Sequence, residues 1–143
     1  MNEDTRQLLQ ECTAGCKMAV ESIHQVAEYV QDEKLLQIME NYKKKHKQVE
    51  EDAQEMLEAA GKEEKEPGMM ASAFSWFSTE MHLALKRDSQ QIAKIMMDGC
   101  NMGIQKLSEY YNNYEMADKK AKELVKHLID LEESFMKDMK AFC

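Results

Sequence analysis

One stretch of the sequence occurs twice: Asp4-Thr5-Arg6-Gln7-Leu8 leading to Gly15-Cys16-Lys17-Met18-Ala19-Val20, and Asp88-Ser89-Gln90-Gln91-Ile92 leading to Gly99-Cys100-Asn101-Met102-Gly103-Ile104. The aspartate, the glutamine, the glycine, the cysteine and the methionine are identical in the two copies and have the same spacing. Such a match at fixed spacing indicates an internal duplication. Each copy also begins with residues suited to cap a helix, so two related helical halves are predicted.

The composition is typical of a small helical domain. The chain has 143 residues, enough to bury a core in one domain, with only one proline and five glycines to interrupt helices. Its net charge of -8 argues against binding to nucleic acid or to an anionic membrane. The basic run 43–47 is followed at once by the acidic run 50–52, so these charges are expected to offset one another on a solvated face.

The sequence carries no sign of export or of membrane insertion. The N-terminus has neither a basic segment nor an apolar core of the kind found in secretory signals, and no apolar run approaches the roughly 18 residues of a membrane span. A cytoplasmic protein is therefore predicted. In that reducing compartment the four cysteines are expected to be free thiols or metal ligands rather than disulfides.

The first predicted hairpin covers residues 4–60. Its first helix is expected to be capped by Asp4 or Thr5 and to end near Asp32, which would cap the second helix. Gly61 would end that helix in the left-handed conformation. The second helix carries an apolar stripe at helical spacing, made of Leu35, Met39, Tyr42, His46, Val49, Ala53, Met56 and Ala60.

The second predicted hairpin covers residues 88–142 and repeats this plan. Its first helix is the second copy of the repeat, and Asn112 and Asn113 mark the turn. Its last helix, about 117–142, carries its own stripe of apolar residues. The fold class predicted is all-α: one domain, residues 1–143, in which two hairpins related by a pseudo-twofold axis form a four-helix bundle.

A crossover of residues 61–87 is predicted to join the hairpins. Its charged linker ends at Pro67 and Gly68, and a helix is expected over about 69–86. That helix is apolar on two sides, so it must bury more than one face. The residues proposed to form a contact with a second copy or with a protein partner are Met70, Phe74, Trp76, Phe77 and Met81.

The two hairpins and the long crossover resemble the ferritin-like superfamily, and in particular a bacterial ferritin-like family of unknown function. The resemblance implies a four-helix bundle, with single glutamate iron ligands on the first and third bundle helices and Glu-x-x-His ligands on the other two. By position in the repeat, those two glutamates would fall at Cys16 and Cys100. The one Glu-x-x-His, at Glu21 and His24, lies opposite the apolar stripe and is expected on the surface.

The nearest pairs of possible iron ligands on the other helices have the wrong spacing. They are His46 with Glu50, and Glu123 with His127. Because di-iron chemistry needs several carboxylates that converge in a dry core, the ligand pattern is not retained. An oxidoreductase that uses these four residues is kept as a third possibility.

Sulfur-containing residues suggest another kind of site. If the pseudo-twofold axis passes near the middle of the two repeated helices, Cys16 and Cys100 face each other, with Cys12 and Met96 one turn away. Three thiols and a thioether form a soft-ligand set suited to Cu(I), or to zinc with a fourth thiolate. A thiol-redox role is open to the same residues.

Packing is the other interpretation of these positions. Free cysteine is often buried as a small hydrophobe, and Gly15, Gly99 and Gly103 would allow the repeated helices to approach closely. His46, on the core stripe, is expected to be a hydrogen-bonded structural histidine.

The function predicted first is that of a non-enzymatic bundle with a degenerate di-iron site and no cofactor, which works through self-association, for example as a homodimer, or through a protein partner. The alternative is a soft-metal protein that binds copper or zinc, or a thiol-redox protein. Fold alone does not choose between these functions.

Overall fold

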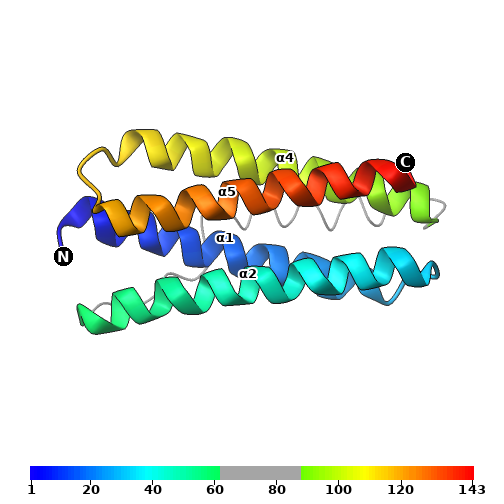
Figure 1. Cartoon of the computed structure of the whole chain (residues 1–143), viewed down its shortest axis with the longest axis horizontal. Helices are drawn as coiled ribbons and strands as arrows, with labels where there is room; N and C mark the ends of the chain where they lie inside the picture. The colour runs from blue at the N-terminus through cyan, green and yellow to red at the C-terminus, as the bar shows by residue number, and fades with distance from the viewer. Residues whose placement is uncertain (62–87) are drawn as a thin grey trace.

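The computed structural model describes residues 1–61 and 88–143, and in this part the chain is all α-helical (Figure 1). Helix α1 pairs with α2 and α4 pairs with α5, so the two predicted hairpins are confirmed, and together they form a four-helix bundle. None of the described helices is long and apolar enough to cross a membrane. The bounds are α1 Glu3–Ala27, α2 Glu33–Ala59, α4 Ser89–Asn113 and α5 Lys119–Met139, with a final 3₁₀ turn η1 at Lys140–Phe142.

Several helix ends follow the sequence signals. The Asp32 side chain accepts hydrogen bonds from the backbone amides of Lys34 and Leu35, at 2.9 and 3.1 Å, and so caps α2 as predicted. Asp88 caps α4 in the same way, with its carboxylate 2.9 Å from the amide of Gln91. Gly61 follows α2 with a φ of +70°, a conformation that favours glycine and that ends the helix as expected.

The start of α1 differs from the prediction. Asn2 is the cap, with its side-chain oxygen 2.8 Å from the amide of Thr5. Asp4 and Thr5 instead hold the loop between α4 and α5, by accepting hydrogen bonds from the amides of Met116 at 2.9 Å and Asp118 at 2.8 Å. The prediction was wrong because a short polar side chain can either cap its own helix or bind the backbone of a neighbouring loop. The sequence looks the same in both cases. Helix α1 also ends at Ala27, a turn earlier than expected.

Helices α2 and α5 present matching faces to the core. Counted from the cap residues Asp32 and Asp118, His46 and Glu132 occupy the same position. Positions at the same distance from the two caps are buried in both helices. The equivalent pairs are Leu35 and Ala121, Met39 and Val125, Tyr42 and Leu128, His46 and Glu132, Val49 and Phe135, and Ala53 and Met139. The predicted stripe of α2 drifts at its end, where Leu57 is buried and Met56 only half-buried.

The repeated helices α1 and α4 match in the same way, with Cys16 and Cys100 both buried. The two helices were expected to approach closely at their glycines. Glycine is not required at position 99, because an added Cβ on Gly99 would meet no described atom within 4 Å. At Gly15 it would lie 3.8 Å from Leu107, an ordinary contact. The pseudo-twofold arrangement therefore rests on matching buried side chains and not on glycine at those two positions.

Candidate functional site

A polar pair lies inside the bundle and joins its two hairpins. His46 of α2 is fully buried, and its Nε2 lies 2.6 Å from Oε1 of Glu132 on α5. Its Nδ1 lies 2.7 Å from the carbonyl oxygen of Tyr42, one turn earlier on α2. The prediction of a buried, hydrogen-bonded histidine is thus confirmed. Its partner Glu132 was not predicted.

The two hydrogen bonds of His46 determine the proton content of the pair. A carbonyl oxygen only accepts, so Nδ1 must carry a hydrogen. The contact between Nε2 and Glu132 then needs one further proton, which can sit on either atom. With that proton the pair is neutral overall, as an imidazolium with a carboxylate or as an imidazole with a carboxylic acid.

The pKa of His46 is raised above its ordinary value of 6.5. Burial is the largest influence and by itself lowers the pKa, because it disfavours the charged ring. The hydrogen bond to Glu132, the negative charge of Glu132 and the Tyr42 carbonyl together outweigh that effect. His46 therefore keeps its proton to a higher pH than a free histidine does.

Two buried thiols lie near this pair, and a third lies beside one of them. Glu132 acts on both Cys100 of α4 and Cys16 of α1, and Cys12 lies one turn from Cys16 on α1. Burial, followed by the charge and the hydrogen bond of Glu132, raises the pKa of Cys100 well above its ordinary range. The hydrogen bond to Cys12, burial and nearby carboxylates raise the pKa of Cys16 in the same direction. Cys16 and Cys100 therefore stay protonated at neutral pH and are poor nucleophiles.

An aromatic contact closes one side of the site. The ring of Phe135 stacks on Tyr42 with centroids 4.5 Å apart and planes 4° apart, and it meets the His46 ring edge-on with centroids 6.3 Å apart. The Tyr42 hydroxyl donates a hydrogen bond to Asp138 at 2.6 Å. Burial and that hydrogen bond raise the pKa of Tyr42 above its ordinary value. The polar pair therefore lies against a rigid, apolar wall.

The predicted soft-metal residues Cys12, Cys16, Met96 and Cys100 are all buried. The structure pairs the first two with each other and gives Cys100 the carboxylate of Glu132 as its partner. In the described part of the chain, no group of three or more His, Cys, Asp or Glu side chains is placed to hold a metal ion. The four-residue metal site stays a prediction.

The residues at the centre of the bundle do not fit a di-iron centre. Cysteines stand at the two positions where the resemblance implies glutamates, and His46 has both ring nitrogens in hydrogen bonds. Among the described residues, Glu132 is the carboxylate that bonds to His46, so one of its oxygens is already engaged. Non-haem di-iron sites need more oxygen ligands than that.

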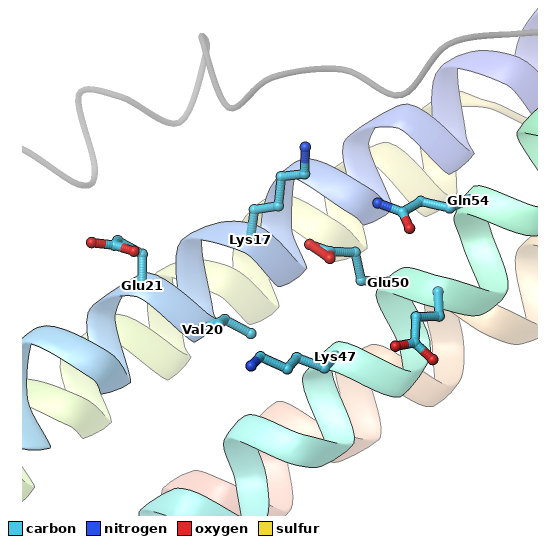
Figure 2. Close-up of a pocket in the computed structure, with 7 residues that line it drawn as sticks. Lys17, Val20, Glu21, Lys47, Glu50 and Gln54 are labelled. Carbon is cyan, nitrogen blue, oxygen red and sulfur yellow. The ribbon is translucent and has the colours of Figure 1, made fainter.

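The four residues of the predicted oxidoreductase site do not come together. Glu50 lines a groove of about 490 Å³ between α1 and α2, where Figure 2 shows it with Lys17 and Glu21 of α1 and Lys47 of α2. A different groove, between α2 and α5, has residues of both helices on its walls, among them Glu123 and His127. His46 is buried in the core. The prediction of an oxidoreductase site was therefore wrong, because the four side chains lie on different faces of the helices. Glu21 and His24 are exposed, as expected.

The proposed contact residues Met70, Phe74, Trp76, Phe77 and Met81 lie outside the described residues. So do the predicted linker and the helix expected over 69–86.

The described helices form an all-α four-helix bundle. The chain is similar in structure to Dps92 from Deinococcus radiodurans, with a TM-score of 0.75 and 14% sequence identity, over 98% of this chain and 86% of that one. At this identity the likeness establishes the fold alone. No family model matches the sequence, and no curated protein matches it.

A thiol titration tests the burial of the cysteines. In the native protein Cys143, which is exposed, should react rapidly with a thiol reagent, and Cys12, Cys16 and Cys100 should react slowly. Reaction at the buried thiols requires opening of the fold, and native domains are stable by about 5–15 kcal/mol, so their rates should be lower by on the order of a thousandfold or more. Mass spectrometry of the labelled peptides measures each rate, and in denaturant all four should react alike. A second fast thiol in the native protein would contradict the burial.

Proposed function

We propose that the protein is a ferritin-like bundle without di-iron chemistry that works through protein contacts, related to the bacterial ferritin-like family of unknown function that its sequence resembles. One observation carries this proposal: His46 and Glu132 bond to each other inside the bundle. They are surrounded by buried, protonated thiols at the positions where the resemblance implies carboxylate ligands.

The same geometry argues against an enzyme site at this place. A general base needs a free lone pair within reach of a substrate proton, and a nucleophilic cysteine needs an accessible thiolate. Both ring nitrogens of His46 are engaged, and Cys16 and Cys100 are buried with raised pKa values. A closed core of this kind supports a role for the bundle as a binding module.

The contact proposed for this module is the apolar side of the crossover. The support for this contact comes from the sequence. Trp76 and Phe77 lie among methionines in a segment that is apolar on two sides and so must bury more than one face. Large aromatic residues supply much of the energy of protein interfaces. The partner proposed is a second copy of the chain, with a different protein as the other possibility.

Two measurements test this proposal. Light scattering during size-exclusion chromatography should give the mass of a dimer for the wild type and of a monomer for Trp76→Ala/Phe77→Ala. A control with Asn41→Ala/Gln48→Ala, two exposed positions of α2, should keep the wild-type mass. A wild-type monomer at all concentrations would remove the self-association, and Fe(II) oxidation faster than the buffer rate would contradict the absence of di-iron chemistry.

The soft-metal alternative is favoured by one observation, the placement of the buried thiols Cys12 and Cys16 one turn apart on α1, where they interact with each other. Two neighbouring thiols suit Cu(I), which soft sulfur ligands select. Elemental analysis with native mass spectrometry, on protein purified without oxygen or chelator, tests it. Copper that is lost in Cys12→Ala/Cys16→Ala and kept in Cys143→Ala would support this alternative over the first proposal.

A further inference from the structure

The bond between His46 and Glu132 connects the two halves of the molecule. His46 belongs to α2 of the first hairpin, and Glu132 belongs to α5 of the second. The two residues hold equivalent positions in the repeat, so they meet near the pseudo-twofold axis. A change in this bond therefore acts on the packing of one hairpin against the other.

We propose that the proton shared by His46 and Glu132 is a pH-sensitive latch between the hairpins, and that its loss at alkaline pH loosens the core and exposes Cys100. This inference is independent of the function proposed above, since it needs neither a partner nor a metal ion. It depends on the two hydrogen bonds of His46, both made inside the bundle.

Removal of the proton leaves a repulsive contact. The Tyr42 carbonyl keeps the hydrogen of His46 on Nδ1, so Nε2 would point a lone pair at the carboxylate of Glu132 across 2.6 Å. Water cannot relieve this repulsion at once, because His46 is fully buried. The pair must separate or admit water, and either change opens the contact between α2 and α5.

The surrounding titratable groups favour retention of the proton. They are Cys16 from α1 and Cys100 from α4, and the charge of Glu132 acts on both. Each of these groups is neutral or negative in its two protonation states, so none of them repels a positive charge on the pair. The two thiols stay neutral over the pH range of interest, because their pKa values are raised.

The sign of the pH effect follows from linkage. In the unfolded chain His46 loses its proton near its ordinary pKa of 6.5, and in the folded chain it does so at a higher pH. Between these two pKa values of His46, the folded state holds one proton more than the unfolded state. Stability from the latch is thus complete below about pH 6.5 and is lost as pH rises, with a fall in the folding equilibrium constant of up to about tenfold per pH unit.

Glu132→Gln is the matched test, because it removes the shared proton and can keep the hydrogen bonds. The glutamine amide can donate to Nε2 of a neutral His46, and its oxygen can accept from Cys100. Urea unfolding of the wild type should show a folding constant that falls steadily from pH 6.5 to 8, a range below the ordinary pKa of thiols, and the variant should show a much smaller fall. Equal slopes in the two proteins, or a flat wild-type profile, would overturn the latch.

Thiol labelling reads the opening of the core directly. The labelling rate of Cys100 divided by that of the exposed Cys143 should rise with pH in the wild type and stay nearly constant in Glu132→Gln. Should this variant fail to fold, NMR of the wild-type His46 ring nitrogens and of the Glu132 carboxyl carbon decides, because the shared proton can sit on either group. Loss of the proton from both groups near pH 6.5 would reject the proposal, and its retention on either group to a higher pH would support it.

Discussion

Glu132→Met is expected to lower the free energy of unfolding by about 3–5 kcal/mol, the usual effect of removing one partner of a buried, hydrogen-bonded pair. The substitution keeps a side chain of similar length, so little volume is lost. It leaves Nε2 of the fully buried His46 without its partner, and it also removes the acceptor of the Cys100 thiol. Urea unfolding at pH 6, where the wild-type pair holds its proton, measures the loss.

The double variant His46→Leu/Glu132→Met separates the bond from the packing. With both partners apolar no buried polar group is left unpaired, and such replacements are often neutral or stabilising. We therefore expect the double variant to be more stable than Glu132→Met alone, which requires an interaction energy larger than the loss of about 3–5 kcal/mol expected for His46→Leu alone. Strictly additive effects of the two substitutions would mean that the pair contributes no direct interaction.

Phe135→Ala is expected to lower the free energy of unfolding by about 3–5 kcal/mol, through lost burial and the cavity that remains. Phe135 is 1% exposed and stacks on Tyr42, so its removal opens a space beside the polar pair. The loss should appear as a lower urea midpoint with an unchanged slope of free energy against urea.

Phe142→Ala is the matched control for that prediction. It deletes the same side chain from a half-buried position in the 3₁₀ turn η1, where less apolar surface is removed from water. Its loss of stability should be clearly smaller than that of Phe135→Ala. Equal losses would show that the stacking wall beside His46 and Glu132 is not the tightly packed part of the core.

The sequence is sufficient to predict the helices and their pairing. Helical spacing of apolar residues and the repeat give the two hairpins, because both signals depend on neighbours a few residues apart. The caps at Asp32 and Asp88 and the helix end at Gly61 follow from local rules of the same kind. The stripe of α2 was less accurate after Ala53, since small errors in helical phase accumulate along a long helix.

The candidate site was only half predictable. His46 stands out on an apolar stripe, and the buried thiols stand out through the repeat, but helical spacing alone does not separate Glu132 from the adjacent Glu133. A usable signal existed, because Glu132 and His46 hold the same position after the aspartates that precede their helices. Which of two adjacent glutamates points inward changes with a rotation of one residue, about 100° around the helix.

The all-α architecture, the duplication and the burial of Cys16, Cys100 and His46 follow from the sequence, since each of these depends on local periodicity. The contacts between distant side chains follow only from the fold: His46 meets Glu132 across the hairpins, and Thr5 meets the loop before α5. Such contacts join residues far apart in the chain, and their geometry depends on how four helices are rotated and shifted against one another. That arrangement is set by the packing of the whole core, so no short stretch of sequence contains it.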